Sequence, residues 1–217
     1  MAAGAEQSQC KMSSLEILGT VLGVIGVGLM IRQNVWGWPI GLVQVTISGW
    51  LFFGAKLYSD VLLQFCFFVI QGYGWWHWLR GSSRVNIARA TRNGSKQPRL
   101  PVTRLGVPAM GSWIVAGIVA TAGWGELMRR ATDAALPHWD AFILVFSLIA
   151  QLWQAQKRIE CWGGWMVVNV VAVGVYWAKD LQLYAGLYLI FLVMAAAGHI
   201  AWKRSLKSAT SVGERTR

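Results

Sequence analysis

The sequence has little charge. Only 13% of its 217 residues are Asp, Glu, Lys or Arg, whereas soluble domains average about 25%. Hydrophobic residues make up 55% of the chain, so the composition suits lipid better than water. A helix needs roughly 20 apolar residues to cross a hydrocarbon core about 30 Å thick. Seven apolar runs approach this length and predict an all-α membrane protein: Leu15–Ile31, Trp36–Ala55, Val61–Leu79, Leu105–Gly125, Trp139–Gln156, Trp162–Ala178 and Leu181–Trp202.

Residues for catalysis, metal binding and disulfide formation are also scarce. Cys10, Cys66 and Cys161 have no paired or metal-like spacing, and the three histidines lie far apart. The sequence contains no recognisable nucleophile–base pair and no glycine-rich phosphate loop. The acids of the apolar runs lie near the ends of those runs: Glu16, Asp60, Glu126, Asp140, Glu160 and Asp180. We therefore expect no enzyme, no cofactor, no metal site and no buried carboxylate suited to a proton or sodium relay.

Positive charge is present in excess, with a net charge of +11. The cations lie in gaps between apolar runs rather than on one polar face, so we expect no nucleic-acid binding. Of the 20 Lys and Arg residues, five fall on the side of the N-terminus and fifteen on the other side. The positive-inside rule then predicts an external N-terminus and a cytoplasmic C-terminus. Residues 80–104 are expected to form a basic cytoplasmic loop, and residues 203–217 a disordered basic tail.

Weak similarity between the two halves of the chain indicates an internal repeat. Trp38 and Trp162 are 124 residues apart, and the amides Gln44 and Asn169 are 125 apart. The repeats would span residues 15–79 and 139–202, with a linker helix at 105–128 between them. A single linker helix returns the chain to its starting side, so both repeats would run in the same direction. This is the 3+1+3 parallel-repeat arrangement of SWEET transporters, whose substrate sites lie near the midplane between the repeats.

Polar side chains inside apolar runs are costly in lipid, so they usually face a cavity or a neighbouring helix. The main candidates are Gln44, Gln64, Gln71 and Asn169, and ordinary interhelical hydrogen bonds are the competing interpretation. Trp162-Gly163-Gly164-Trp165 places two rings on one helix face, where a flat cationic ligand could stack. An aromatic belt at the lipid headgroups is the competing interpretation. We assign Trp76 and Trp78 to such a belt.

Two parts of the chain carry distinctive short motifs. The first part carries Leu57-Tyr58-Ser59, Leu62-Leu63-Gln64 and Tyr73-Gly74-Trp75, and the second carries Trp139-Asp140, Lys157, Glu160, Trp162-x-x-Trp165 and Asn169. Together they resemble the PnuC family of nicotinamide riboside transporters. The resemblance covers roughly residues 15–202, apart from the basic loop.

This resemblance implies facilitated diffusion of nicotinamide riboside across a bacterial inner membrane. A separate cytoplasmic kinase would then phosphorylate the riboside and trap it. The resemblance also implies a SWEET-like fold and a homotrimer. The family's substrate site uses aromatic rings and amides, which by position would be Trp162, Trp165, Asn169, Gln44, Gln64, Gln71, Tyr73 and Trp75.

Two alternatives remain open at this point. The same fold could carry thiamine, riboflavin or another small solute. A non-transporting membrane protein would need a catalytic constellation or a large soluble docking surface, and the sequence indicates neither.

Overall fold

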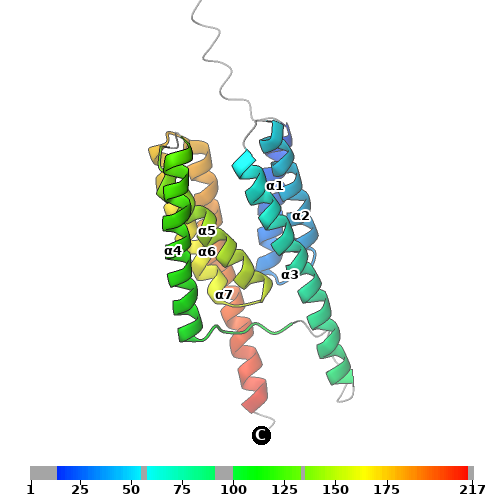
Figure 1. Cartoon of the computed structure of the whole chain (residues 1–217). Helices are drawn as coiled ribbons and strands as arrows, with labels where there is room; N and C mark the ends of the chain where they lie inside the picture. Colours follow the sequence, from blue (N-terminus) through cyan, green and yellow to red (C-terminus); the bar gives the residue numbers. More distant parts are fainter. Residues whose placement is uncertain (1–13, 55–57, 91–99, 133–134, 215–217) are drawn as a thin grey trace, which may run out of the picture.

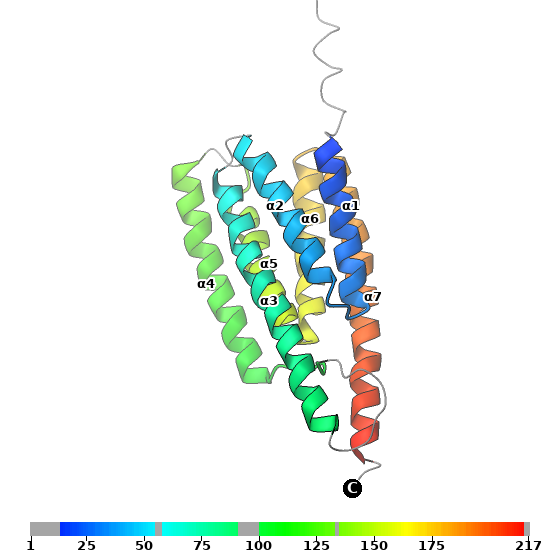
Figure 2. The same cartoon turned by 90° about the vertical axis from the view of Figure 1, so that its right-hand side faces the viewer.

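A computed structural model describes residues 14–54, 58–90, 100–132 and 135–214 of the chain. These residues form a bundle of seven α-helices that run alternately up and down (Figures 1 and 2). The helices are α1 (Ser14–Ile31), α2 (Gly37–Gly54), α3 (Tyr58–Ala90), α4 (Val107–Ala131), α5 (Pro137–Ala155), α6 (Glu160–Ala178) and α7 (Gln182–Glu214). The all-α fold predicted from the apolar runs is therefore confirmed.

The helix boundaries repeat at a constant spacing. Each of α5, α6 and α7 ends 124 residues after the end of its counterpart among α1, α2 and α3. Both sets of three helices begin at the same end of the bundle (Figure 1). The first helix of each set packs on the third helix of the other set: α1 contacts α7, and α5 contacts α3. This regularity supports the three-helix repeat, with α4 as the helix between the two sets.

Three of the turns between helices share one hydrogen-bonding pattern. Gln33, Lys157 and Asp180 each have a positive φ, of 55°, 59° and 59°. In each turn, the N–H of this residue donates a hydrogen bond to the carbonyl three residues earlier in the chain. The N–H of the following residue donates to the carbonyl five residues before itself. This is the Schellman ending of a helix, which glycine usually provides, because other residues lose roughly 1–2 kcal/mol in the left-handed conformation. Gln33 and Lys157 occupy matching places, 124 residues apart.

Four helices are long and apolar enough to cross a membrane by length and composition, namely α1, α4, α6 and residues 182–208 of α7. The other three, α2, α3 and α5, are at least as long as α1, and each carries glutamine among its apolar residues. Large apolar side chains also cover the outside of the bundle; Trp50 and Val107, for example, are 75% and 76% exposed. Such a surface is suited to contact with lipid tails.

The ends of two helices differ from the sequence-based expectation. α3 continues to Ala90, well into the predicted loop that begins at residue 80, and α7 continues to Glu214, through most of the predicted disordered tail. The sequence-based prediction ended both helices where their apolar runs end. Lys and Arg are good helix formers, however, so a helix can leave the hydrocarbon region without ending.

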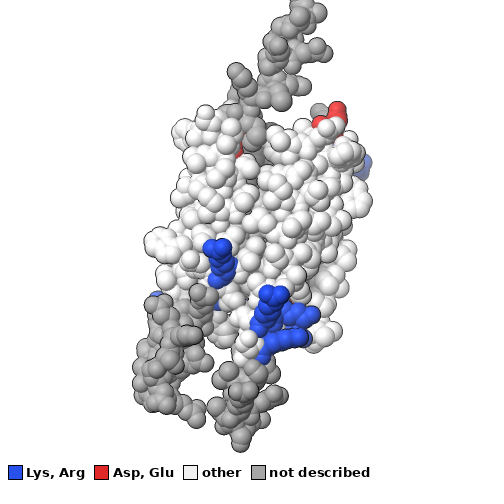
Figure 3. Space-filling view, turned by 180° about the vertical axis from the view of Figure 1, so that it is seen from behind, with Lys and Arg blue, Asp and Glu red and all other residues white. Residues whose placement is uncertain are grey.

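Charge differs between the two ends of the bundle. We call the end where α1 begins the N-terminal end, and the opposite end, where α7 finishes, the basic end. Figure 3 shows blue Lys and Arg side chains gathered mainly toward the basic end of one face. At the N-terminal end, Arg129 and Arg130 are 2.7 and 2.6 Å from Glu126, and Lys179 is 2.7 Å from Asp140. At that end, Lys179 is paired with its own carboxylate, whereas Arg129 and Arg130 share the single carboxylate of Glu126.

Candidate substrate cavity

A cavity of about 890 Å³ lies inside the bundle, with residues of all seven helices in its wall. This volume is within the range of about 300–1,000 Å³ that is typical of small-molecule sites. The wall extends from Asp140 and Lys179 at the N-terminal end to Met30 and Trp162 toward the basic end. Asp140 and Lys179 keep 39% and 24% of their side chains exposed, so solvent reaches this end of the cavity.

Amide side chains from several helices meet in the wall of the cavity. Gln44 of α2, Gln64 and Gln71 of α3 and Asn169 of α6 all line it. Gln71 and Asn169 are only 6% and 3% exposed, and neither amide forms a hydrogen bond within the described part of the chain. Buried amides usually have a partner. Their free donors and acceptors are therefore available to a solute or to water inside the cavity.

A glycine allows one of these amides to reach its position. A Cβ atom on Gly41 of α2 would coincide with the Gln71 side-chain oxygen. The Gln71 amide thus lies directly against the backbone of α2. Any larger residue at position 41 would displace it from the cavity wall.

Helix α5 adds a polar stripe that faces α6. Ser147, Gln151 and Gln154 recur at helical spacing and all line the cavity. The Trp165 indole Nε1 donates a 3.0 Å hydrogen bond to Oε1 of Gln154. This bond holds one edge of the Trp165 ring, while the side chain as a whole is only partly buried. A face of the ring is therefore available for stacking.

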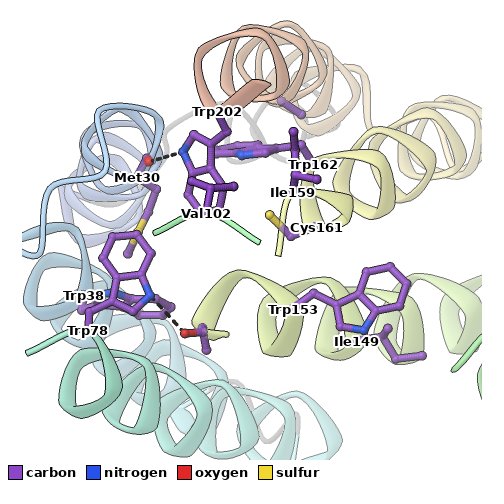
Figure 4. Packing of buried hydrophobic residues seen from close by; sticks show 12 residues of the cluster. Met30, Trp38, Trp78, Val102, Ile149, Trp153, Ile159, Cys161, Trp162 and Trp202 are labelled. Carbon is purple, nitrogen blue, oxygen red and sulfur yellow. Dashed lines mark hydrogen bonds between the residues drawn. The ribbon is translucent and has the colours of Figure 1, made fainter. Parts of the chain in front are cut away.

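Four buried tryptophans, Trp38, Trp78, Trp162 and Trp202, lie together at the end of the cavity that points toward the basic end, and Trp162 also lines the cavity (Figure 4). We call them the tryptophan quartet. Trp38 packs edge-on against Trp78, and Trp162 packs edge-on against Trp202, each with 5.4 Å between ring centroids. Trp78 and Trp202 meet in the middle at 6.0 Å. Each ring is at most 1% exposed, so the quartet closes this end of the bundle.

Two matching hydrogen bonds join the quartet to the backbone of the opposite helix set (Figure 4). The Trp78 indole donates to the carbonyl of Ala155 at the end of α5, at 3.0 Å. The Trp202 indole donates to the carbonyl of Met30 near the end of α1, at 3.1 Å. The carbonyl of Met30 also accepts from the backbone N–H of Gln33, and Nδ1 of His77 lies 3.2 Å from the carbonyl of Ala155. The indoles therefore add a second contact at each helix end and tie the two sets together.

The structure corrects the assignment of Trp78 to a lipid-facing belt. Trp78 is 1% exposed, and the Lys157 ammonium lies 4.4 Å from the centre of its ring. Trp76, two residues earlier, is 49% exposed and stacks with Arg80. Neighbouring tryptophans on one helix point in different directions, so only one of the two could face the core.

The structure brings six of the eight predicted site residues to the cavity: Trp162, Trp165, Asn169, Gln44, Gln64 and Gln71. Tyr73 and Trp75 do not line it. Tyr73 is 38% exposed and stacks on His77 with 5.7 Å between centroids, and Trp75 is 37% exposed. Both came from the third-helix motif, which contains residues on every face of α3.

Sequence analysis missed several wall residues at the N-terminal end. Tyr176 of α6 and Tyr188 of α7 line the cavity and stack with centroids 5.1 Å apart. Asp140 and Lys179 also line it as an ion pair. The two members of each pair come from different helices, so no spacing along the chain announces them. Within the described residues, no group of three or more His, Cys, Asp and Glu side chains could hold a metal ion.

A bundle of apolar helices around a polar, aromatic cavity is the architecture of a multi-pass membrane transporter for a small solute. Residues 13–204 match the family described as nicotinamide mononucleotide transporter. The chain therefore belongs to this family, and the resemblance to PnuC proteins predicted from the motifs is confirmed.

Individual relatives agree with this assignment. The nicotinamide riboside transporter PnuC of Escherichia coli is 25% identical over 90% of this chain and 87% of its own length. The riboflavin/roseoflavin transporter RibM of Streptomyces davaonensis is 26% identical over 86% of this chain and 83% of its own. A crystal structure of the vitamin B3 transporter PnuC superposes with a TM-score of 0.69 and 22% identity, over 89% of this chain and 82% of the other. That structure has the same fold.

Proposed function

We propose that this protein carries nicotinamide riboside down its concentration gradient into the cytoplasm, where a separate kinase phosphorylates and traps it. The observation that carries this proposal is the inner wall of the cavity. The face of Trp165 and the unpaired amides of Asn169 and Gln71 lie there together. An aromatic face attracts a pyridinium ring, and amides can bond a carboxamide and ribose hydroxyls.

Two relatives bear on the choice of substrate. The PnuC proteins named above support the riboside, and RibM supports riboflavin as a second candidate. A cavity of about 890 Å³ is large enough for either solute. The two differ in charge, since riboflavin is neutral and the riboside carries a permanent positive charge. Cation–π attraction to Trp165 favours the riboside.

Purified protein in liposomes is expected to equilibrate nicotinamide riboside rather than accumulate it. Asp140 is the one carboxylate among the described wall residues, and both of its oxygens accept hydrogen bonds from Lys179. This leaves no free carboxylate there to bind a coupling proton or sodium ion. Uptake of labelled riboside should stop when the inside and outside concentrations are equal.

Riboflavin and thiamine, offered in the same assay, serve as comparison solutes. Empty liposomes and excess unlabelled riboside give the background. Accumulation above the external concentration under a proton or sodium gradient would contradict facilitated diffusion. Uptake of riboflavin but not of the riboside would assign the protein to the second candidate function.

We further propose that the basic end faces the cytoplasm. The excess of fifteen Lys and Arg residues over five supports this orientation. A fluorescent protein fused after Arg217 should fold and fluoresce, whereas alkaline phosphatase at the same place should be inactive. An active phosphatase fusion at Arg217 would reverse the orientation and, with it, the side from which the cavity is reached.

A further inference from the structure

The ion pair between Asp140 and Lys179 has an unusual place in the protein. Among the described residues that line the cavity, these two are the charged ones. The Lys179 ammonium donates to both Asp140 oxygens, at 2.7 and 2.8 Å. The pair thus presents one carboxylate and one ammonium to any solute that enters from the N-terminal end, with no net charge between them.

Helix ends stabilise both members of the pair. Asp140 lies in the first turn of α5, where the helix dipole favours a negative charge. Lys179 is the residue directly after α6, where the dipole favours a positive charge. The helix ends thus favour the sign of charge that each side chain carries. Replacement of one partner should leave a charged mouth rather than a neutral one.

The pair lies far from the proposed stacking site. Lys179, at the end of α6, follows Trp165 by fourteen residues, which corresponds to about 21 Å along the axis of α6. The stacked Tyr176 and Tyr188 lie between the two levels in the wall. A solute from the N-terminal end thus passes the ion pair before it reaches the amides and Trp165. The pair can select what enters without taking part in the final contacts.

We propose that Asp140 and Lys179 form a charge-selecting mouth of the cavity. In this mouth the Asp140 carboxylate binds the Lys179 ammonium group, which would otherwise attract phosphate. This inference rests on the proposed function, since it concerns discrimination between a riboside and its phosphate ester. With the pair intact, a phosphate meets a carboxylate and a cation that is already bound. A singly positive riboside meets no repulsion. The phosphorylated product is therefore kept from returning through the cavity.

The physical reason is the local field at a partly desolvated mouth. A phosphate monoester carries roughly −1.5 to −2 charges near pH 7, so transfer into a poorly hydrated passage needs a compensating cation. Lys179 supplies that cation only when Asp140 is not bound to it. Side chains that are a quarter to two fifths exposed are partly screened, so the expected changes are moderate and weaken with salt.

The test compares three variants of the full chain in proteoliposomes: Asp140→Asn, Lys179→Met, and the exchange Asp140→Lys with Lys179→Asp. Nicotinamide riboside uptake gives the KM, and nicotinamide mononucleotide is offered as inhibitor and as labelled substrate. Asp140→Asn should bind the mononucleotide roughly three- to tenfold more tightly and the riboside more weakly. Lys179→Met should change the affinities for the mononucleotide and the riboside in the opposite directions. The exchanged pair should return both affinities close to those of the wild type.

Opposite signs for the two single variants support charge selection. If a variant changes the affinities for the riboside and the mononucleotide with the same sign, the pair only ties α5 to α6, and the inference is overturned. An unchanged mononucleotide affinity in Asp140→Asn would overturn it as well. Riboflavin and its monophosphate form a second matched pair of solutes. If the wild type carries riboflavin and not the riboside, the proposed substrate fails, but riboflavin monophosphate should still show the sign expected for the mononucleotide, and the affinity for neutral riboflavin should change little.

Discussion

Trp78→Ala and Trp202→Ala are expected to be the most destabilising single substitutions outside the cavity. Each removes a ring that is at most 1% exposed and leaves a helix-end carbonyl without its indole donor, that of Ala155 or Met30. Buried Trp→Ala changes cost ~3–5 kcal/mol in soluble proteins. Lipid is itself apolar, so the transfer contribution shrinks and we expect a value near the lower limit. The thermal midpoint in detergent should fall by roughly 6–12 °C.

Trp76→Ala is the matched control on the same helix. This ring is 49% exposed, and its substitution removes only partly exposed contacts with Arg80 and Tyr73, so the cost should stay below ~1 kcal/mol. Trp78→Phe should recover much of the packing but not the hydrogen bond to Ala155. Trp78→Ala should exceed Trp202→Ala, because the buried Lys157 also loses its aromatic partner. Equal shifts for Trp76→Ala and Trp78→Ala would contradict the quartet as the core of the fold.

Trp165→Ala is expected to weaken binding of nicotinamide riboside by at least tenfold, or about 1.4 kcal/mol. The substitution removes the ring face in the cavity wall and also frees the Gln154 amide that the ring orients. Trp165→Phe should restore part of the affinity, because phenylalanine keeps a weaker π face but has no N–H. Titration calorimetry on purified protein measures both variants.

Asn169 and Trp162 refine this expectation. Asn169→Leu should weaken a riboside that bears the carboxamide more than an analogue without it, since hydrogen bonds are directional. Trp162→Ala should reduce thermal stability as well as binding, because that ring packs edge-on against Trp202. Tyr73→Phe, outside the cavity, is the control that should leave affinity unchanged. If well-folded Trp165→Ala and Asn169→Leu proteins bind normally, the substrate occupies another part of the cavity.

Further matched positions in the sequence support the predicted three-helix repeat. Beyond Trp38 and Trp162, the pair Gly74 and Gly198 and the pair Trp78 and Trp202 are each 124 residues apart. The structure explains this recurrence. Cβ atoms on Gly74 and Gly198 would overlap the rings of Trp38 and Trp162, so both glycines allow a ring to lie against the helix. The pattern Gly-x-x-x-Trp thus repeats because the same packing occurs twice.

Amide positions were predictable for a simple reason. A glutamine or asparagine inside an apolar run avoids lipid. This restricts the amide to a cavity or a neighbouring helix, as for Gln44, Gln64, Gln71 and Asn169. Aromatic residues have no such restriction, since a tryptophan is stable in a core, in a cavity wall or at the headgroups. For this reason Trp78 was placed wrongly. The direction of a ring depends on which neighbour leaves room for it.

By itself, the sequence determined the class of protein, the helical architecture and the residues that supply polar groups inside the bundle. Apolar length, charge distribution and repeat spacing are properties of the chain alone. Only the tertiary structure decided which tryptophans close the basic end, and that Asp140 and Lys179 meet at the other. Those contacts join helices whose residues lie far apart in the chain, 39 positions for the ion pair and 172 for Trp202 and Met30. Their geometry follows from how α1, α3, α5, α6 and α7 pack, which no local pattern encodes.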